Sequence, residues 1–406
     1  MKSRKNIFLI ISLMYIIYTI FPLLSDTVSL PVWLPSMASV AFLFVLYPKA
    51  FYNTVFYWFL AYAFVLWLYQ TMGKPLTIGI GSVQDSKKLL IEYAYILPTI
   101  SIFCILKYLN DHQLTKRLIL WSVVGLYVSF VVSVPLMLKY NSLREALSIN
   151  GEEFYVAGLP GYSLMHAYTL FIPAICYAVK ITRGIRRWIF VVALMLLCYV
   201  VYDTFVTTSL IIMISILFFT LIYTDSNTHV SWIVFFIVGI FLVVLYERGF
   251  FISVIDWSLP LFEGTPVESK LLDFKESMIQ GRIVGGTISV RQERHDKSWV
   301  SFGQNPIFGT GEVGGHSSIL DRLGGMGIFA GIPFIMIFVS FIQQMVKCYK
   351  SRMARTFFWV GIAGGLVFLY QKGLWGSESW LIYMVLMPMI ILVIERKELS
   401  YGTTTS

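Results

Sequence analysis

Three arginines and a histidine in one polar segment are the side chains best suited to chemistry on a phosphorylated substrate. Arg282, Arg291 and Arg294 lie within thirteen positions, and His316 follows after a glycine-rich turn. The arginine side chain is a planar fork of N–H donors that matches phosphate oxygens in pairs. A histidine can bind an anion or exchange a proton near neutral pH. The segment therefore predicts a site for a phosphate or pyrophosphate group.

The residues around His316 predict the beginning of a helix. Gly309-Thr310-Gly311 would let the backbone approach a ligand closely. Ser317 or Ser318 can cap a helix that begins here, and the N–H groups of such a terminus favour a nearby anion. We therefore count Ser317 and the following Arg322 among the candidate contacts to a pyrophosphate or glycan.

Each of these residues also has a structural interpretation. An arginine in an external loop is most often solvated or paired with an acid, and Glu293 and Asp296 could be those partners. His316 alone would more often be a structural hydrogen-bonding residue than a catalyst. We interpret His295 as a solvated loop residue because it lies in a run of charges, and His166 as a packing residue at a helix end.

The composition places these residues in a membrane protein. Hydrophobic residues make up 57% of the 406 positions and charged residues 13%, and the apolar residues fall in blocks. The four cysteines lie in or beside those blocks, which argues against a disulfide framework and against a cysteine metal site. We expect no metal and no cofactor. The net charge of +9 is explained by basic cytoplasmic loops, so a nucleic-acid partner is not expected.

The spacing of the apolar blocks predicts an all-α polytopic protein with twelve spans. Crossing the hydrocarbon core takes about 20 mostly apolar residues. With a cytoplasmic N-terminus, seventeen Lys and Arg lie in inside segments and six in short outside loops, which satisfies the positive-inside rule and puts both termini in the cytoplasm. The expected spans are Asn6–Leu24, Leu30–Leu46, Ala50–Tyr69, Leu89–Leu106, Leu118–Leu138, Leu164–Val179, Trp188–Val206, Thr207–Tyr223, Val230–Tyr246, Met326–Gln344, Thr356–Tyr370 and Trp380–Ile394.

This topology divides the chain into four parts. Residues 1–246 hold nine spans and a short external loop at 139–162, and residues 247–325 form one large external loop. Residues 326–395 hold the last three spans, and 396–406 form a cytoplasmic tail. Within the large loop, Pro266–Gln280 has apolar residues at helical spacing and predicts an amphipathic helix near the membrane surface. We expect a glycine-punctuated loop at 281–299.

The segment Asn305–Pro333 resembles the signature region of the O-antigen polymerase and ligase superfamily. In that family a proline and a Gly-x-Gly turn close the large periplasmic loop. A histidine, usually followed by Asn, then opens the next helix, and further glycines follow. The matching residues here are Pro306, Gly309, Gly311, His316, Gly327 and Gly331.

Arginines outside that segment extend the resemblance, and the chain departs from the family pattern in two places, at Arg144 and at Ser317. Arg291 corresponds best to the family's upstream arginine, with Arg294 a close second. Arg144 is a loose match to the arginine of the shorter external loop. Ser317 stands where Asn is usual, which alters the His-Asn pair.

The resemblance implies a metal-independent glycosyltransferase with a GT-C-like fold in the bacterial inner membrane, with its active site on the periplasmic face. The donor would be an oligosaccharide on undecaprenyl pyrophosphate, and membrane lipids and a chain-length regulator protein are the further partners implied. His316 and Arg291 would be catalytic, and His316 could act as a base or as a pyrophosphate contact. The residues that would bind pyrophosphate or glycan are Arg294, Arg282, Arg144, Arg322 and Ser317.

Three functions stay open at this point. A polymerase would join lipid-linked repeat units of an O-antigen or capsule. A ligase would transfer the finished glycan to lipid A-core or another acceptor, with the same donor chemistry. A transporter or flippase also suits twelve spans, but it predicts internal repeats and ionisable residues near mid-membrane. The polar residues concentrate in one external loop instead, which favours chemistry at the membrane surface.

Overall fold

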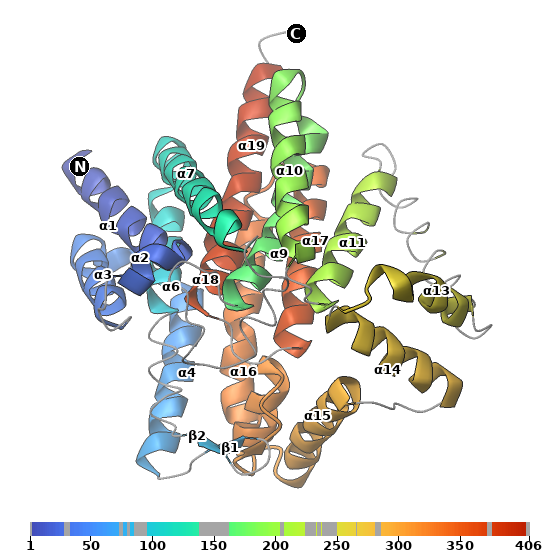
Figure 1. Cartoon of the computed structure of the whole chain (residues 1–406). Helices are drawn as coiled ribbons and strands as arrows, with labels where there is room; N and C mark the ends of the chain where they lie inside the picture. Colours follow the sequence, from blue (N-terminus) through green and yellow to red (C-terminus); the bar gives the residue numbers. More distant parts are fainter. Residues whose placement is uncertain are drawn as a thin grey trace.

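The chain folds almost entirely into helices (Figure 1). The computed structural model describes residues 2–27, 33–72, 76–78, 82–84, 96–137, 162–203, 207–223, 233, 237, 250–264, 266–280, 286–371 and 376–402. In the first half the helices are α1 (Lys2–Ile20), α2 (Pro22–Thr27), α3 (Trp33–Leu46), η1 (Pro48–Phe51), α4 (Thr54–Thr71), α6 (Leu97–Leu109), α7 (His112–Met137) and α9 (Tyr162–Ile181). The others are α10 (Ile185–Asp203), α11 (Thr207–Ile222), α13 (Phe250–Ser258), η3 (Leu259–Leu261), α14 (Pro266–Gln280), α15 (Gly286–Gln304), α16 (Ser318–Val346), α17 (Arg352–Gln371), α18 (Ser377–Leu381), the π-helical η4 (Ile382–Leu386) and α19 (Met387–Gly402).

Six of the described helical segments are long and apolar enough to cross a membrane, namely α1, α7, α10, α16, α17 and the continuous run from α18 to α19. Shorter apolar helices lie at four further expected spans: α3, α6, α9 and α11. The 18-residue α4, which carries no charged residue, lies at the expected third span. The expected span Val230–Tyr246 falls outside the described residues except for two positions.

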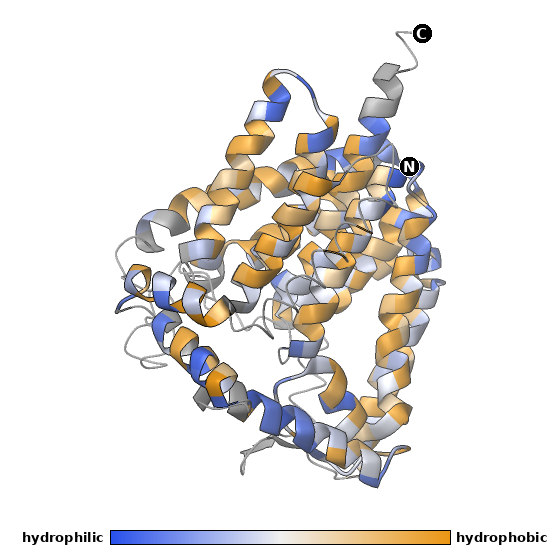
Figure 2. Ribbon diagram, turned by 90° about the vertical axis from the view of Figure 1, so that its right-hand side faces the viewer, coloured by the Kyte–Doolittle hydropathy of each residue, from blue (hydrophilic) through white to orange (hydrophobic). Residues whose placement is uncertain are grey.

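Large apolar side chains cover the outer surface of the bundle, as contact with lipid requires. On α10, Trp188, Val192, Met195 and Tyr199 follow one another at helical spacing and are all exposed, with Trp188 69% exposed. A water-soluble protein rarely leaves so large an apolar surface uncovered. Figure 2 shows hydrophobic residues along the whole bundle, while hydrophilic residues gather at its ends and along α14 and α15.

The interior of the bundle is built on aromatic rings from α16, α17 and the α18–η4 segment. Phe338 stacks on Trp380 with ring centroids 5.0 Å apart, and Phe341 lies 6.1 Å from both Phe358 and Tyr383. Rings at these separations attract each other in addition to burying apolar area. This aromatic core holds α16, which carries the candidate site at its N-terminus, against the C-terminal helices.

Two expectations about the elements need correction. The stretch expected as a loop at 281–299 is helical from Gly286 onward, because Thr287–Phe302 contains neither glycine nor proline and Gln292 bonds Asp296 one turn later at 2.7 Å. The helix of the expected tenth span begins at Ser318, as the residues around His316 predict, and α19 continues past residue 396 to Gly402. The amphipathic helix expected at Pro266–Gln280 is confirmed as α14.

The second correction is a small sheet, which an all-α fold does not include. Its strands are β1 (Leu76–Ile78), β2 (Ser82–Gln84) and β3 (Glu312–Val313), in the order β2-β1-β3. The strand β1 pairs antiparallel with β2 and parallel with β3, where Thr77 lies opposite Glu312. Residues that follow α4 are thereby joined to the segment just before His316.

The candidate site lies at the end of the bundle opposite the two chain termini. In Figure 1 the C-terminus lies at the top and the N-terminus at the upper left, whereas α15, the sheet and the N-terminal end of α16 lie at the bottom. Helices α13 and α14 lie to the side of the bundle, and they expose Trp257, Leu272 and Ile279.

Candidate functional site

The first turns of α16 are separated from the rest of the helix by a break at Gly327. Gly327 has φ 64° and ψ −165°, so the i to i−4 hydrogen bonds cannot run through it. The loop after α15 supplies the missing partners. Ile328 N–H donates to Pro306 O at 2.8 Å, and Gly311 N–H donates to Gly325 O at 3.0 Å. A break inside an apolar helix is stable when its backbone groups are satisfied in this way.

The glycines of the Gly-x-Gly turn serve this backbone packing. Gly309 has φ 66°, and a Cβ there would lie 2.3 Å from the carbonyl carbon of Gly325. At Gly327 a Cβ would lie 2.2 Å from the carbonyl oxygen of Ile307. We expected the turn to let the backbone approach a ligand. In the structure it approaches the backbone of α16, and the Tyr69 hydroxyl of α4 fastens the junction by donating to Phe308 O and Met326 O.

Helix α15 lies directly on the loop that precedes α16. A Cβ at Gly314 would lie 1.9 Å from the carbonyl oxygen of Arg294, and one at Gly324 would lie 2.5 Å from that of Ser298. Only glycine allows so close an approach of two backbones. The side chains of α15 near Arg294 are therefore fixed relative to the N-terminus of α16.

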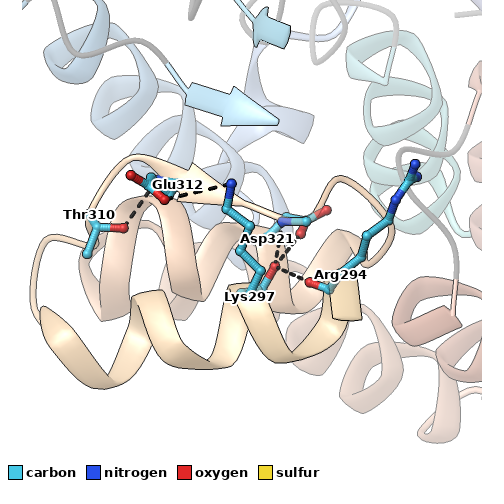
Figure 3. A network of polar contacts seen from close by, with 7 residues as sticks. Arg294, Lys297, Thr310, Glu312 and Asp321 are labelled. Atoms are coloured by element: carbon cyan, nitrogen blue, oxygen red, sulfur yellow. Dashed lines mark hydrogen bonds and ion pairs between the residues drawn. The ribbon is translucent and has the colours of Figure 1, made fainter. Parts of the chain in front are cut away.

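The carboxylate of Asp321 joins these two elements (Figure 3). Its Oδ1 accepts a hydrogen bond from the Ser298 hydroxyl at 2.8 Å and one from Gly315 N–H at 3.2 Å. Its Oδ2 accepts from Ser317 N–H at 3.1 Å. Ser298 Oγ in turn accepts from Gly314 N–H at 2.9 Å. The network satisfies buried backbone groups on both sides of His316.

Ser317 caps α16, as the sequence predicts. It has extended backbone dihedrals, and its hydroxyl accepts from Leu320 N–H at 3.1 Å. The space at this helix N-terminus, where we expected a phosphate, is however partly taken by the Asp321 carboxylate. An internal anion already occupies the favourable position beside the positive end of the helix dipole. The Ser317 hydroxyl is buried and engaged in the cap. Its contact with a substrate stays a prediction.

Arg322 lies inside the protein, between α16 and α4. It is 4% exposed, its Nε donates to the Tyr62 hydroxyl at 3.2 Å, and its Nη1 donates to Ser318 O at 2.8 Å. The guanidinium also lies over the ring of Phe334, 4.9 Å from its centroid. These contacts hold α4 against the site, and a role of Arg322 in binding substrate stays a prediction.

Arg291, Arg294 and His295 share one face of α15. Arg294 and His295 follow Arg291 by three and four positions, so each of them neighbours Arg291 on the helix surface. Figure 3 shows the Arg294 side chain extending away from the Asp321 network. Within the described residues, no ion pair joins its guanidinium to a carboxylate; Asp296 bonds Gln292, and Glu312 pairs with Lys297 at 3.7 Å. This leaves Arg294 disposed to meet an anionic ligand.

The interpretation of His295 as a solvated residue is wrong. Its side chain is 7% exposed, and its ring packs against Tyr370 of α17 with centroids 5.3 Å apart. Burial is the main cause that lowers the pKa of His295 below its ordinary value, and Arg291 acts in the same direction, while Asp321 and Asp296 oppose them. Charged neighbours in the sequence do not reveal this burial, because they do not imply that a residue is exposed to solvent when its helix packs on another.

The remaining candidates divide between described and undescribed parts of the chain. His316 lies half-buried immediately before the Ser317 cap. His166 is buried, with Nδ1 3.0 Å from Ser209 Oγ and its ring on Phe368, which confirms the packing role. Arg144 and Arg282 lie outside the described residues. Among the residues that the structure describes, no group of three His, Cys, Asp or Glu side chains could hold a metal ion.

No model of a known protein family matches this chain, and no characterised protein matches it in sequence.

Proposed function

We propose that the chain is a bacterial inner-membrane glycosyltransferase that joins undecaprenyl-pyrophosphate-linked repeat units of an O-antigen or capsule. The observation that carries the proposal is the placement of Arg291 and Arg294 on a helix locked beside His316. A glycosyl pyrophosphate already has a good leaving group, so the enzyme must stabilise its growing negative charge and orient an acceptor hydroxyl. Two arginines and a histidine on a rigid frame suit both tasks, because fixed donors need no rearrangement as charge develops.

The proposed topology has twelve spans, with both termini in the cytoplasm and the site on the periplasmic face. It is supported by the position of the site at the end of the bundle opposite the termini. The exposed apolar side chains of α13 and α14 suit helices that lie along the outer membrane surface. A lipid-linked donor would then reach Arg291 and Arg294 from the membrane.

Extension of a purified donor tests this function. The chain in proteoliposomes is given undecaprenyl-pyrophosphate-linked oligosaccharide extracted from the cells that produce it, and products are separated by size. We expect a ladder of longer glycans from the wild type and none from Arg291→Ala or His316→Ala. Lys275→Ala, which removes a half-buried charge of α14 paired with Asp256, is the matched control and should extend normally.

A ligase shares the donor, so the acceptor separates the two enzymes. Transfer to added lipid A-core with no extension of repeat units would show that the chain is a ligase rather than a polymerase. The arginines would keep their proposed roles in both cases, since the same pyrophosphate leaves.

The broken helix α16 is the one observation that favours a transporter, because interrupted helices often bind ions or substrates. Here, however, the loop hydrogen-bonds the backbone groups at the break, including Ile328 N–H and the carbonyls of Gly324 and Gly325. The break therefore offers few open coordinating groups. Ion-coupled uptake of sugar or lipid-linked glycan by the proteoliposomes, without glycan extension, would support transport instead.

A further inference from the structure

His295 carries a buried nitrogen that has no partner in the described part of the protein. Its Nε2 is inaccessible to solvent, and none of the described residues lies within hydrogen-bonding distance of it. Buried polar atoms are almost always hydrogen-bonded, so such an atom needs an explanation. One explanation is that a ligand supplies the partner.

The second buried histidine beside α17 provides a comparison. His166 packs its ring on Phe368, as His295 does on Tyr370, yet its Nδ1 lies 3.0 Å from Ser209 Oγ. His166 therefore has the contacts of a structural residue. For His295 the described residues provide a ring contact and no hydrogen bond to Nε2, and a phenylalanine could make the ring contact equally well.

The surroundings of His295 favour a neutral imidazole that can accept a proton. Burial and Arg291 of the same helix disfavour the charged form, so the ring is neutral at rest. Asp321 of α16 and Asp296 of α15 favour the charged form, so they stabilise the ring once it gains a proton. A carboxylate that stabilises a forming imidazolium is a common arrangement around a general base. Tyr370, the facing residue of α17, is 39% exposed, so His295 lies one side chain below the surface.

We propose that His295 is the general base of this site and that its Nε2 takes the proton of the acceptor hydroxyl. The inference rests on the proposed function. The acceptor oxygen bonds to the anomeric carbon of the donor, and the bond from that carbon to the pyrophosphate oxygen breaks. Undecaprenyl pyrophosphate leaves with the electron pair, facing Arg294 and Arg291. The proton passes to Nε2, and it leaves the ring for water when the departing product opens the site, which restores the neutral ring. His316 then contacts the pyrophosphate rather than the acceptor.

Two substitutions separate proton transfer from packing. His295→Phe keeps the ring on Tyr370, and His295→Gln keeps a hydrogen-bonding group that does not titrate. We expect both to fold, to keep the apparent KM for the donor, and to lose about 100-fold or more in turnover, as the loss of a general base does. The wild-type rate should fall at acidic pH, and the residual rate of His295→Gln should not show this fall. Added imidazole should restore part of the activity of His295→Ala. Gln292→Ala, on the exposed face of the same helix, is the control.

Several results would contradict the inference, and they can be told apart. A His295→Phe protein with turnover near wild type would overturn the inference, as would a wild-type rate that does not fall between about pH 8 and 5. Loss of the acidic decline in His316→Gln with its retention in His295→Gln would assign the base to His316. Absence of any glycan transfer by the wild type would overturn the proposed function and this inference together. Normal transfer that requires Arg291 but not His295 would overturn the inference alone.

Discussion

The hydroxyl of Ser298 donates to Asp321 Oδ1 at 2.8 Å while its oxygen accepts from Gly314 N–H at 2.9 Å, so one side chain of α15 joins both sides of the His316 segment. Ser298 and Asp321 are both largely removed from solvent. The position of the arginine-bearing helix relative to His316 depends on this contact.

Ser298→Ala should therefore destabilise the protein and loosen the site. The substitution leaves the buried Gly314 N–H without an acceptor, which costs about 1–3 kcal/mol. Thermal unfolding of the detergent-purified protein measures this as a lower transition temperature. Ser253→Ala on α13, where the serine is exposed, is the matched control and should unfold like the wild type. Equal stability of the two variants would show that the Ser298 network does not hold α15.

Gly309→Ala should be strongly destabilising, whereas Gly303→Ala should not. Gly309 combines φ 66° with a Cβ position 2.3 Å from the Gly325 backbone, and nothing there can move without opening the break in α16. Gly303 lies near the end of α15 with open space around its Cβ position, so alanine should be neutral or stabilise by up to about 1 kcal/mol. Size-exclusion profiles and unfolding temperatures of the two variants measure the difference, and a well-folded Gly309→Ala protein would contradict the packing described.

Arg294→Lys should be nearly as inactive as Arg294→Ala in glycan extension. A lysine provides a point charge but not the paired donors that match two phosphate oxygens. The guanidinium has no ion pair among the described residues, so its removal should leave the unfolding temperature close to that of the wild type. Extension by Arg294→Lys at the wild-type rate would show that charge alone suffices. A large loss of stability in Arg294→Ala would indicate a structural role.

The stability of the wild type should fall as the pH drops below neutral, in part because of His295. The pKa of His295 in the folded protein lies below its ordinary value of 6.5, so the unfolded chain binds more protons in the window between the two values. The contribution of His295 to the free energy of unfolding is therefore complete above pH 6.5 and is lost as the pH falls through that window. His295→Phe removes the contribution, so the stability difference between the two proteins should change with pH between about 7 and 5. A difference that is constant over that range would contradict a buried neutral histidine.

The sequence predicted most helices of the bundle because long apolar blocks leave few other ways to cross a membrane. It also predicted α14 from its apolar spacing and the cap at Ser317 from the serine beside the glycine-rich turn. Each of these features is local, and its signal lies within a few turns of chain.

Helix α15 and the sheet were missed for physical reasons. The face of α15 that packs on α16 carries His295, Ser298 and Ser301, which are polar, so the usual search for apolar periodicity cannot find it. The repeat of buried positions every three to four residues, with no proline or internal glycine before Gly303, was the available signal. The pairing of β1 with β3 joins segments more than 230 residues apart, and short strands of this kind leave no local pattern.

The contacts of the Gly-x-Gly turn give it a different role from the predicted one. A sequence can show that Gly309 and Gly311 allow close approach, but it does not show what approaches. The partner is the broken backbone of α16, which becomes visible only once Gly327 is seen outside helical dihedrals. The turn therefore builds the frame of the site, and the chemistry is left to the side chains of α15 and His316.

The most direct test of the account is the stoichiometry of glycan transfer in proteoliposomes that contain only this chain and its undecaprenyl-pyrophosphate-linked donor. Mass spectrometry counts both the lengthened glycan and the released undecaprenyl pyrophosphate. The account predicts one released undecaprenyl pyrophosphate for each new glycosidic bond, in the absence of divalent metal, and neither product from Arg291→Ala. Donor that stays unchanged with the folded wild-type protein, or is moved across the membrane intact, would contradict it.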